Sequence, residues 1–277
     1  MCPRKYVSQS TGFMDRNLFE KIILAMKHKE IEAVVPFFRG ESLLHPYFAE
    51  MMAQLRENTS AEIQLATNAL LLDKQLIRHL IELEIDFISF SLDAFKKQTY
   101  EKIRRGGDFD LAVNNVKEFL KQRKDNPHNK TVVQVSATEN KDNKSELSEF
   151  IQYWKGRADR VRIYPCHSEG GRFGELPQSR HRKELALRGP CKKPFADFVI
   201  YYDGRVALCN HDWDRNGDRS LGSLNDQSIM EIWNGKPYEH VRERHLDRLW
   251  CELSPCAHCD HWIGADGTTT CIGELYT

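Results

Sequence analysis

The sequence has few of the features that mark membrane, secreted or nucleic-acid-binding proteins. None of its apolar runs approaches the roughly 20 residues that a membrane-spanning helix needs, and no basic segment followed by an apolar one opens the chain. Lysine and arginine number 40, as do aspartate and glutamate, so the formal net charge of the 277 residues is +0. Solenoid repeats and low-complexity tracts are also missing. These absences favour a globular cytoplasmic protein without a membrane or nucleic-acid partner.

Cysteine, in contrast, is plentiful, with eight residues that cluster late in the chain. Because cytosolic thiols stay reduced, we expect metal ligation rather than disulfide bonds. Cys191 and Cys209 flank a predicted β-hairpin that turns at the Asp-Gly pair 203–204. Cys256 and Cys259 have the Cys-x-x-Cys spacing that aims two thiolates at one metal. The two pairs together predict a four-thiolate site.

The thiolates alone do not identify the metal. Four cysteines suit structural zinc and an iron–sulfur cluster about equally, and the residues by themselves slightly favour a zinc ribbon that staples a small domain. Cys251 is a spare candidate ligand, whereas Cys166 and Cys271 are interpreted as ordinary thiols.

From residue 32 to about 165, short β-rich segments alternate with amphipathic helical segments, which predicts repeated βα units around a parallel sheet. The expected strands are 32–38, 62–67, 87–93, 131–138 and 160–165. The expected helices are 17–28, 46–57, 74–84, 109–124 and 145–156. Right-handed crossovers would curl these units into a barrel or partial barrel, with ligands at the carboxyl ends of the strands. We therefore expect a barrel domain at 1–165, a linker at 166–190 and a cysteine-bearing domain at 191–277.

Two of these strands place polar residues on one face. The period of two puts Ser89, Ser91 and Asp93 together, and likewise Gln134, Ser136 and Thr138. A closed barrel filled only by packing prefers branched apolar residues on both faces, so we favour a solvated or ligand-filled lumen. The alternative is that this face meets water at the edge of a sheet.

Four stretches match the motifs of a known family. MCPRKYVSQSTGFMD matches the end of a CxxxCxMCPR motif followed by Gly-x-Met-Asp, FFRGESLLHP stands in the place of a Gly-Gly-Glu-Pro motif, and Thr67 with Asn68 matches a Thr-Asn pair. The last stretch runs from Cys191 through Asp-Gly-Arg-Val, Cys209 and LGSLNDQSIMEIWNG to CAHCDHW. In this order and spacing the chain resembles the radical S-adenosylmethionine (radical SAM) superfamily, in the branch with a SPASM or twitch extension.

The resemblance implies the fold: an α/β, partial (β/α)6-type parallel barrel with its first strand missing, followed by a small cysteine-rich domain. It implies that Cys2 is the third ligand of the radical SAM [4Fe–4S] cluster. The first two ligands would precede Met1, as expected for a misplaced start or a truncated gene. The cluster's ligand set is then incomplete in this chain.

The resemblance also implies the site residues. The expected S-adenosylmethionine contacts are Gly40, Glu41, Thr67, Asn68, Ser91 and Gln134. Glu41 would bind the amino group of the cofactor, although a Gly-Glu pair is also common in simple turns. Thr67 and Asn68 could instead cap a helix from Leu70 onward.

One auxiliary [4Fe–4S] cluster on Cys191, Cys209, Cys256 and Cys259 fits the motif better than two. Arg172 is the candidate catalytic residue, and Arg162 and Tyr164 are further candidates for substrate contact.

The implied activity is that of a radical SAM oxidoreductase. Reductive cleavage of S-adenosylmethionine gives a 5′-deoxyadenosyl radical, which takes a hydrogen atom from a small-molecule or peptide substrate. The auxiliary cluster then accepts an electron, and flavodoxin or ferredoxin is the expected electron donor. Two alternatives stay open: a peptide-modifying radical SAM maturase, and a noncatalytic metal-stapled scaffold or binding module.

Overall fold

The computed structural model describes residues 11–27, 29–165, 188–212, 220–254, 256–259, 261–263 and 274–277. These residues form two compact units. The cysteine unit comprises residues 11–25 and those within 188–263, and the sheet unit comprises 26–165 and 274–277. The expected domain boundaries at 165 and 191 stay a prediction. The packing groups residues 11–25 with the cysteine unit, although they precede the sheet in sequence.

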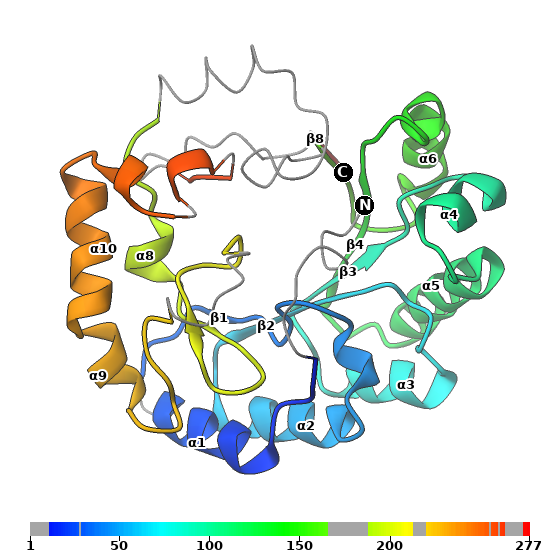
Figure 1. Ribbon diagram of the computed structural model, residues 1–277. Coiled ribbons are helices and arrows are strands. Elements are labelled where there is room, and N and C mark those ends of the chain that lie inside the picture. The colour runs from blue at the N-terminus through cyan, green and yellow to red at the C-terminus, as the bar shows by residue number, and fades with distance from the viewer. Residues whose placement is uncertain are drawn as a thin grey trace. The chain divides into compact units, whose positions relative to one another are not determined.

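The sheet unit is built on a six-stranded sheet in the order β1-β2-β3-β4-β5-β8 (Figure 1). Its strands are β1 Ala33–Val34, β2 Glu62–Thr67, β3 Phe87–Ser91, β4 Val132–Thr138, β5 Arg160–Tyr164 and β8 Glu274–Tyr276. Strands β1 to β5 are parallel and follow chain order, which confirms the expected βα arrangement. Because the parallel strands follow one another without reversal, their carboxyl ends share one rim of the sheet.

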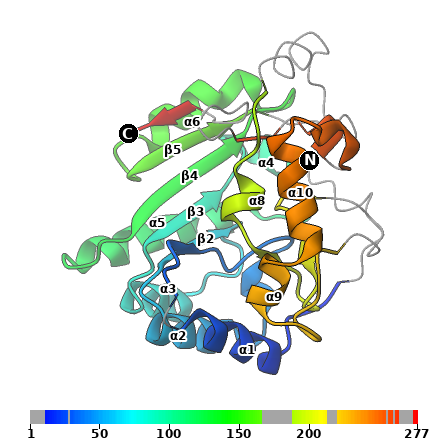
Figure 2. The same ribbon diagram turned by 90° about the vertical axis from the view of Figure 1, so that its left-hand side faces the viewer.

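Two strands differ from the expectation. The first was expected at 32–38, but β1 covers only Ala33–Val34, since Pro36 has no N–H to donate to a neighbouring strand. Strand β8 was not predicted. It pairs antiparallel with β5, and Figure 2 shows the two side by side.

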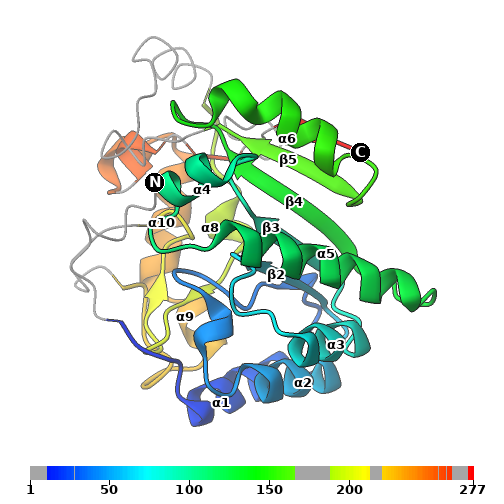
Figure 3. The same ribbon diagram turned by 90° about the vertical axis from the view of Figure 1, so that its right-hand side faces the viewer.

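Helices cover one face of the sheet, as Figure 3 shows for α3, α5 and α6. The helices of this unit are α2 Phe48–Asn58, α3 Lys74–Glu82, α4 Lys97–Ile103, α5 Phe109–Asp125 and α6 Leu147–Trp154. All but α4 lie where the sequence predicted a helix. The alternate residues of β3 and β4 that contact these helices are apolar and fully buried, and the Phe90 ring packs against Phe119 of α5 at 5.2 Å.

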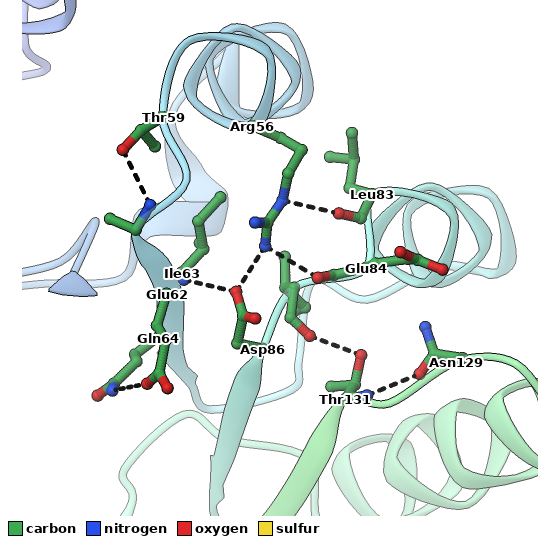
Figure 4. Close-up of polar contacts among 12 residues, drawn as sticks. Arg56, Thr59, Glu62, Ile63, Gln64, Leu83, Glu84, Asp86, Asn129 and Thr131 are labelled. Carbon is green, nitrogen blue, oxygen red and sulfur yellow. Dashed lines mark hydrogen bonds and ion pairs between the residues drawn. The ribbon is translucent and has the colours of Figure 1, made fainter. Parts of the chain in front are cut away.

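Arginine–aspartate pairs fasten the amino ends of the strands, and Figure 4 shows the pair of Arg56 and Asp86. Arg56 of α2 binds Asp86 at 2.6 Å and donates to the carbonyl oxygens of Leu83 and Glu84, and Asp86 also accepts the Ile63 N–H of the adjacent strand.

Arg123 of α5 binds Asp159 in the same way, and Asp159 accepts the Val133 N–H at 2.7 Å. Asp86 directly precedes β3, and Asp159 directly precedes β5. Each carboxylate therefore links a helix to two strands.

The cysteine unit is made of short elements. They are α1 Arg16–Met26, α8 Lys193–Ala196, β6 Val199–Ile200, β7 Val206–Ala207, α9 Ile229–Trp233, α10 Lys236–Leu246 and the 3-10 turns Trp250–Glu252 and Cys256–His258. Their core contains Leu18, Val206, Leu208, Leu221, Leu224, Ile232, Tyr238, Val241 and Leu253. The expected hairpin is present, with Gly204 in its turn at φ 87, a conformation that glycine adopts without strain.

Among the helices of the described ranges, none combines the length and the apolar character that a bilayer crossing requires.

Candidate cofactor and cluster sites

Glu41 joins the segments that follow β1 and β2. It begins the 3-10 turn Ser42–Leu44, and its Oε1 accepts the Leu43 N–H at 3.3 Å. Its Oε2 accepts the Asn68 N–H, which lies just beyond β2, at 2.9 Å. The structure therefore brings Glu41 and Asn68 to the same rim of the sheet. A carboxylate has about four lone-pair directions, so these two bonds leave Glu41 with capacity for an ammonium group.

The backbone around Glu41 is held in an unusual conformation. Gly40 has φ 119, in the region that favours glycine, and this residue is therefore required for the turn into Glu41. Ser42 occupies the place of a motif proline, and its hydroxyl donates to the Pro36 carbonyl oxygen at 2.7 Å. That bond fixes the turn without the proline ring.

Thr67 and Asn68 shape the turn after β2. The Thr67 hydroxyl accepts the Ala69 N–H at 3.1 Å, and the Asn68 Oδ1 accepts the Leu70 N–H at 2.9 Å. The alternative that this pair caps a helix from Leu70 is wrong, because α3 begins at Lys74 and is capped by Asp73. Ala69 has φ 65, a strained conformation for a residue with a side chain.

The polar face of β3 and β4 is buried. Ser89, Gln134 and Ser136 are 6%, 4% and 5% exposed, and both strands lie inside the sheet rather than at its edge. The Gln134 amide donates to the Ser89 hydroxyl at 3.0 Å and to the Tyr164 hydroxyl at 3.3 Å. The alternative of a water-facing sheet edge is therefore wrong, while a ligand-filled lumen stays a prediction. Ser91 is opposite Ser136 and is half-buried.

Asp93 does not continue this face as expected. Strand β3 ends at Ser91, and Asp93 has φ 62. Its carboxylate binds the Arg104 guanidinium at 2.6 Å and accepts the Thr138 N–H at 2.8 Å. The side chain is only 3% exposed, so Asp93 fastens β3 to β4 instead of lining a lumen.

Arg162 and Tyr164, the predicted substrate contacts, lie next to one another on β5. Arg162 of β5 lies over the Tyr164 ring at 5.6 Å, and its buried Nε has no hydrogen-bond partner in the described part of the chain. Cys2 and Arg172 lie outside the described residues.

Cys191, Cys209, Cys256 and Cys259 are free thiols, and three of their sulfurs accept backbone hydrogen bonds. The Cys191 sulfur accepts the Ile263 N–H at 3.4 Å, the Cys209 sulfur accepts the His211 N–H at 3.4 Å, and the Cys259 sulfur accepts the His261 N–H at 3.3 Å. Such donors favour the thiolate form and tune iron–sulfur clusters.

The thiols also interact electrostatically. Burial, followed by the charges of Cys259 and Cys256, raises the pKa of Cys209 well above its ordinary value. Burial, followed by Cys259, raises the pKa of Cys256 to about 12, and Cys191 also contributes. The four thiols are therefore close enough to oppose one another's ionisation. Only a bound cation or cluster allows them to be thiolates together, and its binding releases their protons.

This donor set fits an iron–sulfur cluster. Three of the cysteines are buried, all four interact electrostatically, and three sulfurs accept amide donors. Within the described ranges, no three or more His, Cys, Asp or Glu side chains are grouped to hold a metal ion. In a cubane cluster each cysteine binds a different iron, so its four sulfurs are more widely spaced than the ligands of one zinc. The absence of such a group among the described residues is therefore compatible with an iron–sulfur cluster.

Several side chains around the thiols were missed from the sequence. His211 and His261 stack with ring centroids 3.7 Å apart, and each follows its cysteine by two positions, a shared spacing that could have identified them.

Arg188 and His245 are two further buried residues beside the cysteines. His245 accepts the Cys191 N–H on Nδ1 at 3.2 Å, and burial, helped by Arg188, lowers its pKa to about 4, so the ring is neutral. Arg188 donates to the Cys256 carbonyl oxygen.

Family models match both parts of the chain. Residues 1–152 match the radical SAM superfamily, and residues 191–260 match SPASM, an iron–sulfur cluster-binding domain. A protein of Pyrococcus furiosus described as a tungsten-containing aldehyde ferredoxin oxidoreductase cofactor-modifying protein is 27% identical over 93% of this chain and 83% of its own length.

Solved structures share the fold at low sequence identity. BtrN in complex with AdoMet and 2-DOIA has a TM-score of 0.63 at 17% identity, covering 97% of this chain and 88% of BtrN. AnSMEcpe with bound AdoMet has a TM-score of 0.64 at 14% identity, covering 91% and 80%. Streptococcus suis SuiB bound to the precursor peptide SuiA has a TM-score of 0.64 at 12% identity, covering 84% and 61%.

The family match extends over more than half of the chain, and its cofactors are those that the motifs implied. They are a [4Fe–4S] cluster with S-adenosylmethionine, and an auxiliary iron–sulfur cluster in the SPASM domain. With its partial parallel barrel and its convergent thiols, this chain belongs to the radical SAM superfamily of enzymes and carries a SPASM domain at residues 191–260.

Proposed function

We propose that this chain catalyses the S-adenosylmethionine-dependent, two-electron oxidation of a small polar molecule. The observation that supports the proposal is the electrostatic interaction of Cys256 with Cys191, Cys209 and Cys259, three of these four thiols being buried. Four cysteine ligands occupy every iron of a [4Fe–4S] cluster. A substrate therefore has no iron to bind there, and electron acceptance is the role that is left for the site.

The sheet unit provides the cofactor contacts. When bound, the family's cluster and S-adenosylmethionine supply a 5′-deoxyadenosyl radical. Glu41, fixed by the Asn68 and Leu43 amides, receives the cofactor amino group with its spare lone pairs. Gly40 lets the backbone approach the ligand.

Further cofactor contacts come from the carboxyl ends of the next strands. Thr67 and Asn68 hold the turn that presents the Asn68 amide to Glu41. Ser91 and Gln134 contact the ribose and the carboxylate from neighbouring strands.

In the proposed oxidation the substrate loses one hydrogen atom, then one electron and one proton. The substrate loses the hydrogen atom to the 5′-deoxyadenosyl radical, and the resulting substrate radical gives one electron to the four-cysteine site and one proton to a base. An external carrier, flavodoxin or ferredoxin, supplies the electron that cleaves S-adenosylmethionine. In its oxidised form the same carrier takes up the electron that the four-cysteine site received, which returns the site to its starting state. The product is lighter than the substrate by two hydrogen atoms.

Arg162 and Tyr164 of β5 are the substrate contacts that the described residues offer, and Arg172 remains a predicted catalytic residue. The Arg162 guanidinium has no ion pair in the described residues, which suits a substrate with a carboxylate, phosphate or hydroxyl group. The relative that modifies the cofactor of an aldehyde ferredoxin oxidoreductase supports a small molecule. The peptide-bound relative SuiB keeps peptide modification as the second candidate.

The test is anaerobic reconstitution followed by incubation with S-adenosylmethionine, dithionite and either polar small-molecule alcohols or candidate peptides. We expect 5′-deoxyadenosine and a product lighter by two hydrogen atoms from the small molecule. A cross-linked peptide would replace the first candidate with the second. Zinc without iron or sulfide at the cysteines would overturn the proposal.

Variants localise the cofactor site. Glu41→Gln is expected to weaken S-adenosylmethionine binding at least tenfold by calorimetry, because a neutral amide cannot pair with the cofactor's ammonium group. Glu57→Gln, an exposed carboxylate on α2, is the matched control and should bind normally. Equal affinities for the two variants would contradict the role of Glu41.

A further inference from the structure

Arg188 is a buried arginine that forms no ion pair with any residue that the structure describes. It is 5% exposed, and its Nη1 donates to the Cys256 carbonyl oxygen at 2.6 Å. Its guanidinium lies 5.0 Å from the centre of the Trp250 ring. The described residues give it no carboxylate partner, and its Nε has no hydrogen bond. Burial of an unpaired cation is very unfavourable, so a missing anion is the expected partner of this side chain.

The other buried ionisable side chains around the cysteines have partners among the described residues. Lys193, the second buried cation, binds Asn210 Oδ1 at 2.6 Å and Asp197 at 3.4 Å. His245 is neutral and accepts a hydrogen bond from the Cys191 N–H. The buried Asp212 carboxylate accepts the Leu208 N–H. Arg188 is therefore the buried cation beside the cysteines for which the described residues provide no ion pair.

The geometry points to the thiolate-bound cluster as this anion. Four thiolates on an oxidised [4Fe–4S] core carry a net negative charge, and reduction adds one more. We infer that Arg188 compensates the charge of the auxiliary cluster and raises its reduction potential, because a nearby fixed cation favours the more negative, reduced state. Arg188 touches the backbone of a ligand and acts through the field at the cluster, so it is a positioning residue. The inference rests on the four-cysteine site of the proposed function.

The experiment compares Arg188→Gln, Arg188→Lys and the parent chain, all carrying Cys2→Ala so that only the four-cysteine site binds iron. Glutamine and lysine both keep an N–H donor for the Cys256 carbonyl, and only lysine keeps the charge. Arg205→Gln is the matched control, since Arg205 pairs with Asp203 in the hairpin turn of the same unit. Each protein is reconstituted anaerobically, analysed for iron and sulfide, and titrated with dithionite while visible absorbance and electron paramagnetic resonance are followed.

In this titration the cluster gains one electron from dithionite, and no bond forms or breaks. We expect Arg188→Gln to lower the equilibrium constant of reduction at least tenfold, which is about 59 mV for one electron. Arg188→Lys should stay within about threefold of the parent, and Arg205→Gln should match it. A glutamine variant that fails to hold the cluster while the lysine variant holds it also supports the inference, because only charge separates them.

Other outcomes overturn it. A loaded glutamine variant with the parent potential shows that the charge has no role. Equal shifts for glutamine and lysine, or loss of the cluster from both, show that the guanidinium shape matters rather than its charge. Absence of iron and sulfide from the parent chain instead contradicts the four-cysteine site itself, which separates failure of the proposed function from failure of this inference.

Discussion

Arginines of the two units meet different partners. In the sheet unit, Arg56 and Arg123 each bind an aspartate, and that same aspartate accepts an N–H from a neighbouring strand. In the cysteine unit, Arg188 is more deeply buried, and its contacts with the described residues are a carbonyl oxygen and an indole ring. Arg56 and Arg123 are thus balanced within the sheet unit, and their ion pairs hold the fold. The cysteine unit contains a buried cation that none of its described carboxylates pairs with, which is typical of a binding site.

Removal of one thiolate ligand should have the largest effect on the cysteine unit, because it should abolish iron binding there. Cys256→Ser in the Cys2→Ala chain should reduce iron from about four per chain to near zero, because three thiolates and a hydroxyl hold a cluster poorly. Iron and sulfide analysis after anaerobic reconstitution measures it. Cys251→Ser removes an exposed cysteine and should retain the iron. Equal losses from both variants would show that Cys251 is a ligand.

The most buried ion pair of the sheet unit should give the largest change in stability. Asp93→Asn preserves a residue type that tolerates positive φ and removes the charge that faces Arg104. The free energy of unfolding should fall by about 3 kcal/mol in urea titrations, since one buried charge loses its partner. Asp110→Asn breaks an exposed pair with Lys97 and should change it by less than about 1 kcal/mol.

Substitution of one arginine in each unit, with and without bound iron, tests whether the two arginines have different partners. Arg56→Gln should lower the free energy of unfolding by about 1–2 kcal/mol whether or not iron is bound, because Asp86 is its permanent partner. Arg188→Gln should destabilise only the iron-loaded protein, since the apo thiols are protonated and leave the guanidinium unpaired. Thermal unfolding of both variants in apo and loaded forms distinguishes the cases. Destabilisation of apo Arg188→Gln would show a structural role.

Acid titration gives the smallest expected effect. Burial opposes ionisation of Asp159, but hydrogen bonds from Arg123 and the Val133 N–H outweigh it, so its pKa lies below the ordinary value of a carboxyl group. A lowered native pKa contributes stability above the unfolded pKa of about 3.9, and this stability is lost as the pH falls through the native pKa. Asp159→Asn should therefore flatten the decline of the unfolding free energy below about pH 4. An unchanged acid slope would contradict this.

The sheet was predictable where its signals are local. Helices α2, α3, α5 and α6 have amphipathic periods, and β2 to β5 are short apolar runs between them, so their order and parallel direction followed from the sequence. Pro36 shortened β1 in a way that the apolar pattern alone concealed. Strand β8 was missed because its existence depends on pairing with β5, more than a hundred residues earlier.

The candidate sites divide in the same way. Glu41 and Asn68 were expected at one rim because the carboxyl ends of parallel strands meet there, and the four cysteines were visible from their spacing. The hydrogen bond from Arg188 to the Cys256 carbonyl oxygen spans 68 positions of the sequence, so no local pattern predicted it. Asp93 was misplaced because the period of two was extended past the point at which β3 ends.

Strand β8 has a consequence for the behaviour of the protein in solution. Its three residues pair with Val161, Arg162 and Ile163, and so occupy the outer N–H and C=O groups of the last parallel strand. Without that cover, β5 would offer a ready template for strands of other molecules, and such templates start aggregation. A short stretch at the far end of the sequence thus shields the sheet from self-association.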